Sequence, residues 1–168
     1  TEGKSMVDLC SNLRPHTPKL GFKERVYVDI LPRQVEDGEQ DKFIQDDVLD
    51  FLDESSKRYD VALCLDGIEH INKDNGYILI DMMEDKSDKQ IIFTPNQEWM
   101  MTGKDDLNPE SHRSLWTPNM LPRFASIVFP VYHPTLNIGA WFGWQCENIE
   151  QDFERVKNEL KQKSWATN

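Results

Sequence analysis

YDVALCLDGIEHI, residues 59–71, is the stretch of this chain that decides its fold. Its apolar run Val61–Leu65 is short and uninterrupted, which is typical of a strand buried on both faces of a sheet. The run ends at Asp66, so the first polar group follows the carboxyl end of the strand. Ligands of open α/β sheets bind at that end of the strands. We therefore expect a ligand site beside Asp66.

A second buried run repeats the pattern about thirty residues later, in KQIIFTPN at 89–96. GYILIDMM at 76–83 lies between the two runs and is a plausible helix, so the spacing fits a crossover between parallel strands. Apolar or capping patterns predict further strands at 5–10, 25–30, 42–45, 125–129 and 138–144, and further helices at 48–52 and 149–160. The order of elements indicates an α/β fold.

Composition narrows the classes of function. The 168 residues are most simply one domain, 1–168, and the net charge of −11 disfavours broad binding to a nucleic-acid backbone. A small-molecule or protein substrate is favoured. The odd number of cysteines, without a C-x-x-C pair, indicates a reducing compartment. No membrane span or signal peptide is visible, so we expect a cytoplasmic protein.

Three segments, YDVALCLDGIEHI, GYILIDMME and KQIIFTPN, resemble in this order the middle of a class I S-adenosylmethionine-dependent methyltransferase. VDLCSNLRP at 7–15 is similar to the first-strand loop of the subgroup that reads Ile/Leu-Arg-Pro after its glycine motif. The resemblance implies a three-layer, Rossmann-like and mostly parallel seven-stranded sheet with an antiparallel last strand. It also implies a fold trimmed at the N-terminus, whose open donor pocket a second copy, as a homo-oligomer, could cover.

The resemblance implies S-adenosylmethionine as the cofactor and places its binding residues at successive strand ends. Asp29 matches the acid that accepts hydrogen bonds from the ribose hydroxyls. Asp47 resembles the acid that receives the adenine amine, and Val48 would pack on the base. Loop capping is the alternative for Asp29, and helix capping is the alternative for Asp47. The remaining implied cofactor-binding residues are Asp8, Cys10, Asn12, Leu65 and Asp66.

The first loop departs from the family pattern, because Cys10 and Asn12 stand where the glycines would be. Asparagine adopts a left-handed conformation at modest cost, but Cys10 has a side chain where the donor would lie against bare backbone. Two functions therefore stay open. One is a methyltransferase acting on a small molecule or on a sugar or lipid intermediate, and the other is a catalytically silent binding or interaction module. The missing glycine fingerprint disfavours a dinucleotide-binding domain.

Glu69 and His70 are the candidate catalytic residues. Methyl transfer is an in-line displacement that depends mainly on positioning. His70 could accept a proton from the acceptor, and Glu69 could act with His70 or orient it. The alternative is a pair that only fixes the turn from strand to helix.

Residues 94–118 resemble the family loop beside the acceptor. In it, Trp99, Met100 and Met101 would form an apolar wall for a substrate or a plug for the core. His112, Arg113 and Trp116 would tie this loop down. The four histidines, His16, His70, His112 and His133, lack the spacing of a metal site, and we predict no metal.

Overall fold

The computed structural model describes residues 4–12, 20–32, 41–96, 108–109, 111–133 and 138–165. Its strands are β1 (Ser5–Leu9), β2 (Glu24–Asp29), β3 (Asp41–Gln45), β4 (Val61–Leu65), β5 (Lys89–Pro95), β6 (Ala125–His133) and β7 (Ile138–Cys146). Its helices are α1 (Val48–Glu54), α2 (Lys73–Lys86) and α3 (Ile149–Trp165), with the short 3-10 helices η1 (Ile68–His70) and η2 (Pro118–Met120).

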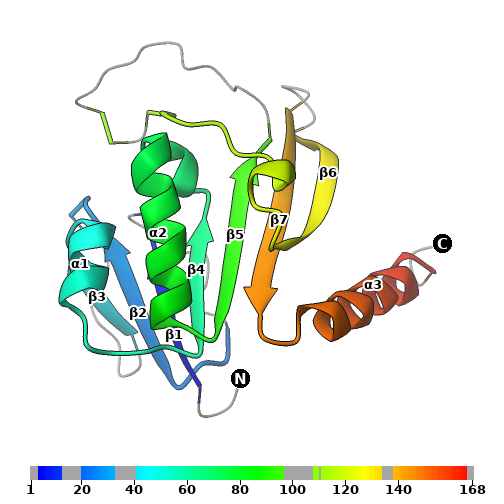
Figure 1. Ribbon diagram of the computed structural model, residues 1–168, viewed down its shortest axis with the longest axis horizontal. Helices are drawn as coiled ribbons and strands as arrows, with labels where there is room; N and C mark the ends of the chain where they lie inside the picture. The colour runs from blue at the N-terminus through cyan, green and yellow to red at the C-terminus, as the bar shows by residue number, and fades with distance from the viewer. Residues whose placement is uncertain are drawn as a thin grey trace.

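The strands form one seven-stranded sheet in the order β3-β2-β1-β4-β5-β7-β6 (Figure 1). β1 to β5 pair in parallel, whereas β7 runs antiparallel to both β5 and β6. The predicted α/β fold, with its mostly parallel sheet and antiparallel last strand, is therefore confirmed. β1 lies between β2 and β4, so the chain order reverses there. Such a switch point leaves a crevice at the carboxyl ends of the strands.

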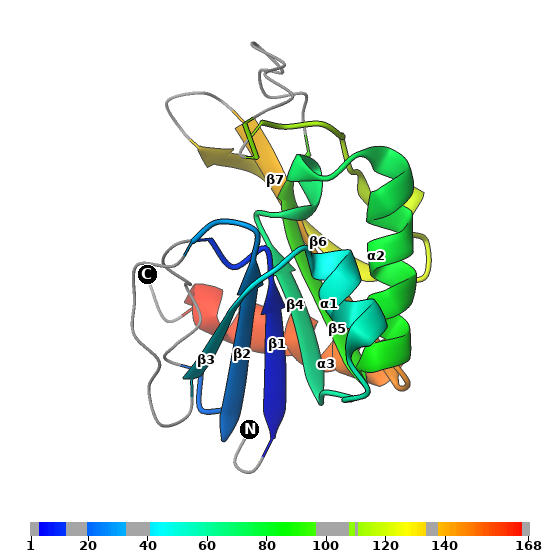
Figure 2. The same cartoon turned by 90° about the vertical axis from the view of Figure 1, so that its left-hand side faces the viewer.

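Helices α1 and α2 cover the same face of the sheet (Figures 1 and 2). Leu79, Ile80 and Met83 of α2 are fully buried in a core that includes Val7 and Leu9 of β1. Side chains alternate along a strand, so Met6 packs instead into a second cluster with Tyr27 and Leu63. Asp8 shares the face of Met6 and is buried. This alternation determines which of the predicted residues can reach the ligand site.

Helix α2 is longer than the predicted 76–83 and begins after Glu69 and His70, which lie in η1. Asn72 starts α2, because its side chain accepts a hydrogen bond of 3.0 Å from the backbone N–H of Asn75. Gly76 then permits close packing: a Cβ built there would lie 2.3 Å from Cζ2 of the fully buried Trp116. The Lys73 Nζ lies 3.4 Å from the centroid of the Trp116 ring.

Helix α3 follows β7 and extends away from the sheet (Figure 1). The Phe153 ring stacks on Trp144 of β7, with 5.9 Å between the ring centroids. Asp152 pairs with Lys89 of β5 and with Arg155 in its own helix. Leu160, nearer the end of α3, is 47% exposed. None of the helices in the described ranges is long and apolar enough to cross a membrane.

We predict that Gly76→Ala destabilises the protein, although alanine is normally favoured over glycine within a helix. The added methyl group would meet the immobile Trp116 ring, and overpacking of this kind costs about 1–3 kcal/mol. Urea unfolding measures the change. Asp85→Ala, on the exposed side of the same helix, is the control and should change the free energy of unfolding by less than about 0.5 kcal/mol. A stabilised Gly76→Ala variant would contradict this packing.

Asp152→Asn should loosen α3 in a pH-dependent way. Hydrogen bonds from Lys89 and Arg155 lower the pKa of Asp152 to about 2, below its ordinary value of 3.8. The pair therefore stabilises the fold above pH 3.8, and this contribution is lost as the pH falls toward 2. Solvent screening limits the expected loss to about 1 kcal/mol at neutral pH. Urea unfolding at several pH values should show the difference from the parent narrowing in acid; a constant difference would refute the assignment.

Candidate functional site

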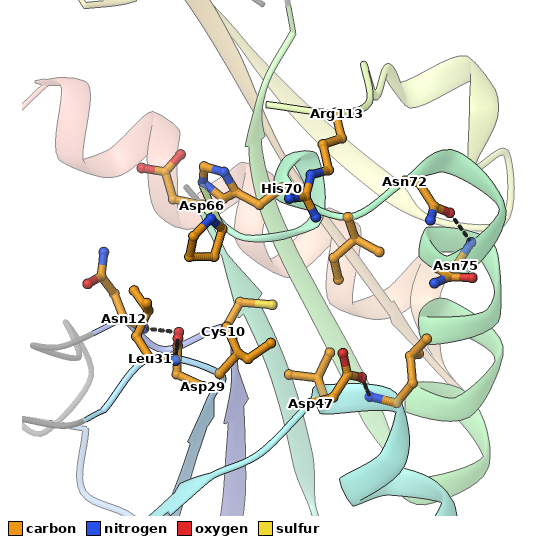
Figure 3. A pocket seen from close by; sticks show the side chains of 15 residues that line it. Cys10, Asn12, Asp29, Leu31, Asp47, Asp66, His70, Asn72, Asn75 and Arg113 are labelled. Carbon is orange, nitrogen blue, oxygen red and sulfur yellow. Dashed lines mark hydrogen bonds between the residues drawn. The ribbon is translucent and has the colours of Figure 1, made fainter. Parts of the chain in front are cut away.

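A cleft of about 230 Å³ lies at the carboxyl ends of β1, β2 and β4 (Figure 3). Asp29, Asp47 and Asp66 all contribute to its lining. Asp29 ends β2, Asp47 precedes α1, and Asp66 follows β4. The carboxyl ends of parallel strands lie on the same side of a sheet, so residues far apart in the chain meet here. The acids that were predicted at successive strand ends are therefore gathered around one cleft.

Seven of the ten predicted site residues line the cleft: Cys10, Asn12, Asp29, Asp47, Val48, Asp66 and His70. Asp8, Leu65 and Glu69 are not part of this lining. Asp8 lies on the face of β1 that points away from α2, and Glu69 is 2% exposed and sits behind the cleft wall. Leu65 is partly buried at the end of β4, beside the second core cluster.

The loops around the cleft adopt the backbone conformation that glycine normally supplies. Cys10, Asn12 and Asp66 have φ angles of 58°, 60° and 58°. A Cβ built at Gly67 would lie 2.5 Å from Cβ of Cys10. The Cys10 side chain therefore occupies space that a side chain at 67 would need.

Asp29 fixes the turns on either side of it. One carboxylate oxygen accepts a hydrogen bond from the Asn12 backbone N–H at 2.7 Å, and the other accepts one from the Leu31 backbone N–H at 2.8 Å. Asp47 caps α1 by accepting from the Leu49 backbone N–H at 2.8 Å (Figure 3). Both carboxylates thus have the structural roles that the sequence left open as alternatives. Each oxygen can accept more than one hydrogen bond, so neither role excludes ligand binding.

Behind the cleft wall, Glu69 is a buried acid with an unusual environment. Its Oε2 accepts a hydrogen bond of 2.9 Å from the Thr94 hydroxyl. Burial and the nearby Asp66 carboxylate raise the pKa of Glu69 to about 8, so the side chain is mostly protonated at neutral pH. The His70 and His112 rings meet edge to face, with centroids 4.8 Å apart. Burial and the neighbouring His70 lower the pKa of His112, which favours its neutral form.

Residues 111–117, which we call the crossing segment, run over η1. The backbone N–H groups of Arg113 and Ser114 both donate to the carbonyl oxygen of Glu69, at 2.7 and 3.1 Å. The Ser114 hydroxyl donates to the carbonyl of Ile71 at 2.7 Å and accepts from the Trp116 indole N–H at 2.7 Å. These bonds tie the segment down, as predicted for His112, Arg113 and Trp116, and they hold Arg113 at the cleft.

Three polar residues of the lining were not assigned to the site from the sequence: Asn72, Asn75 and Arg113. Arg113 was expected only to tie down its loop, although the resemblance of residues 94–118 to the family loop beside the acceptor could have placed it near the ligand. Asn72 and Asn75 have no signal of their own, because an asparagine at a helix start is ordinary. Leu13, Arg14 and Pro15, which carry the subgroup motif, and the proposed wall of Trp99, Met100 and Met101 lie outside the described residues.

No protein-family model matches this chain. No curated protein matches it either. Solved structures do match. A SAM-dependent methyltransferase from Archaeoglobus fulgidus has 13% identity and a TM-score of 0.62, over 85% of this chain and 86% of that one.

Magnesium protoporphyrin IX methyltransferase (ChlM) from Synechocystis PCC 6803, solved with bound SAH, has 13% identity and a TM-score of 0.60, over 85% of this chain and 74% of that one. N-methyltransferase NodS from Bradyrhizobium japonicum WM9, in complex with S-adenosylhomocysteine, has 10% identity and a TM-score of 0.59, over 84% of this chain and 76% of that one. At these identities the likeness shows that this chain has the fold of SAM-dependent methyltransferases.

Ser114→Ala should destabilise the protein by about 1–3 kcal/mol, because it leaves the buried indole N–H of Trp116 without its acceptor. A double-mutant cycle with Trp116→Phe, followed by urea unfolding, isolates this bond. The cost of Ser114→Ala should be clearly smaller when Trp116 is already phenylalanine. Equal costs in both backgrounds would mean that the Ser114–Trp116 bond does not hold the crossing segment.

Proposed function

We propose that this protein is an S-adenosylmethionine-dependent methyltransferase that binds its donor in the cleft and acts on a small molecule. The observation that carries the proposal is the meeting of Asp29, Asp47 and Asp66 around one cleft at the carboxyl ends of parallel strands. The fold shared with SAM-dependent methyltransferases supports it. A sugar or lipid intermediate as the acceptor stays a prediction from the sequence.

The lining fits the nucleoside part of the donor. Asp29 holds two backbone N–H groups and keeps further acceptor positions on both oxygens, which suits a pair of ribose hydroxyls. Asp47 uses Oδ1 to cap α1, so Oδ2 can accept a hydrogen bond from the adenine amine. Ile30, Val48 and Leu49 supply apolar surface beside these acids for the base.

The charge of the lining fits the methionine part of the donor. Three aspartates line the cleft, and among its described lining residues Arg113 is the one with a permanent positive charge. This excess of negative charge favours a ligand with a sulfonium and an ammonium group. Arg113 suits the donor's own carboxylate, because a guanidinium binds carboxylates with two parallel hydrogen bonds. When bound, the donor supplies an electrophilic methyl group on a positively charged sulfur.

His70 is the catalytic candidate in contact with the cleft. Its imidazole can accept a proton from the acceptor if methylation requires deprotonation. Glu69 is mostly protonated at neutral pH, so it is a poor base itself. We assign it a positioning role behind His70. The rest of the catalytic effect would come from holding donor and acceptor in line.

The competing function is a catalytically silent binding or interaction module. It is favoured by the Cys10 side chain, which belongs to the cleft lining at a position where the family has glycine. Affinity for the donor distinguishes the proposed enzyme from a module that no longer binds it.

Calorimetric titration with S-adenosylhomocysteine tests the proposal. We expect micromolar binding by the parent protein and about tenfold weaker binding by Asp47→Asn, because the amide that replaces Oδ2 cannot accept from the adenine amine. Asparagine caps a helix as well as aspartate does, so the thermal stability of Asp47→Asn should be unchanged. Asp53→Asn, on the exposed side of α1, is the matched control. The absence of binding at millimolar ligand in the parent protein would reject the enzyme and favour the silent module.

A further inference from the structure

Beside the cleft, the fold brings together three side chains that commonly bind metals. One ligand atom from each of Glu69, His70 and His112 lies within 4.8 Å of the other two. His70 and His112 are 42 positions apart in the chain, so their spacing gave no sign of this. The prediction that the histidines form no metal site rested on their spacing in the sequence alone. In the folded chain the crossing segment places His112 beside η1, so sequence spacing no longer argues against a site.

Two of the three side chains have atoms without a hydrogen-bond partner. In the described part of the chain, Oε1 of Glu69 and Nδ1 of His70 are both buried and receive no hydrogen bond. Glu69 is 2% exposed, so water does not readily satisfy its carboxyl group. Buried polar atoms are almost always paired, and an absent ion is one of the ordinary reasons for an exception.

The surroundings hold these side chains in place. The Thr94 hydroxyl donates to Oε2 of Glu69 and thereby orients Oε1. The crossing segment is bonded to the carbonyl oxygen of Glu69 immediately after His112. Hydrogen bonds to metal-binding carboxylates, and rigid support behind them, are typical of metal sites because they fix the ligands before the ion arrives.

We propose that Glu69, His70 and His112 bind a divalent transition-metal ion in the wall of the cleft. Two imidazoles and one carboxylate suit Zn²⁺, Co²⁺, Fe²⁺ or Mn²⁺, whereas Mg²⁺ and Ca²⁺ prefer oxygen ligands alone. Around a tetrahedral Zn²⁺ the ligand atoms stand ~3.4 Å apart, so the side chains close in by modest rotations. Asp66 lies near Glu69 and adds a second negative charge to balance the ion.

Three protein ligands leave at least one coordination position for water or substrate. His70 lines the cleft, so an ion held by it lies next to the proposed donor site. If the proposed function holds, the ion would bind an oxygen of the acceptor and lower the pKa of that hydroxyl, so that its proton would pass to water and not to His70. The resulting oxygen anion would form a bond to the methyl carbon while the carbon–sulfur bond breaks, and S-adenosylhomocysteine would leave. The acceptor would then be an oxygen nucleophile. Metal binding itself does not depend on the methyltransferase assignment.

The test is titration of chelator-treated protein with Zn²⁺ in a calorimeter, together with the visible spectrum of the Co²⁺ form. We expect one equivalent of Zn²⁺ to bind at micromolar concentration or tighter, and no detectable binding of Mg²⁺. Glu69→Gln and His112→Gln each remove a proposed ligand, so each should weaken Zn²⁺ binding by at least the roughly 10–100-fold that loss of an outer-shell partner costs. Gln at position 69 can still accept from Thr94, so this variant keeps the local hydrogen bond.

Asp47→Asn is the matched control, because it alters the cleft without touching a proposed metal ligand, and its Zn²⁺ affinity should match that of the parent. In the presence of chelator, His112→Gln should bind S-adenosylhomocysteine as the parent does. Loss of metal binding can then be distinguished from loss of donor binding. Thermal unfolding identifies a variant that does not fold, in which case the other variant decides.

The proposal is overturned if the parent protein binds Zn²⁺ only at millimolar concentration. It is also overturned if the parent and both ligand variants bind Zn²⁺ with equal affinity. Thiolate-to-cobalt charge-transfer bands would also overturn it, because they would assign the ion to cysteines.

Discussion

The carbonyl oxygen of Glu69 accepts hydrogen bonds from two backbone N–H groups that come more than forty positions later in the chain. This contact joins the turn after β4 to the crossing segment, and the Ser114–Trp116 bond and the packing of Trp116 on Gly76 extend it into the core. Arg113 reaches the cleft, and His112 reaches His70, only because of this junction. The chemistry on one side of the site therefore depends on a purely structural set of bonds.

The other side of the cleft depends on the ends of β1, β2 and β4. There Cys10 takes a left-handed conformation, and Gly67 provides the space for its side chain. Left-handed conformations cost about 1–2 kcal/mol for residues with a side chain. Asp29 offsets part of this cost at Asn12 by accepting its backbone N–H. The acid expected to bind a ligand is also the acid that shapes the loop.

The buried carboxyl group of Glu69 links the two sides. Without a positive partner it stays mostly protonated at neutral pH, because burial and Asp66 both disfavour its charged form. An acid in this position would be a costly choice for packing alone, since an apolar side chain could fill the same space. A cation that bound here would use the Oε1 and Nδ1 atoms that otherwise have no partner in the described residues.

The sequence by itself determined the sheet and the row of acids. Short apolar runs predicted the strands, and Asp29, Asp47 and Asp66 meet because parallel strands all end at one edge. Only the tertiary structure decided the rest. Asp8 faces away from the cleft because side chains alternate between the two faces of the sheet along β1. Glu69 and His70 lie in η1 and not in α2, and of the two Glu69 is the buried residue. His70 and His112 meet through long-range hydrogen bonds, and local residue patterns contain no information about contacts between segments that pair only after folding.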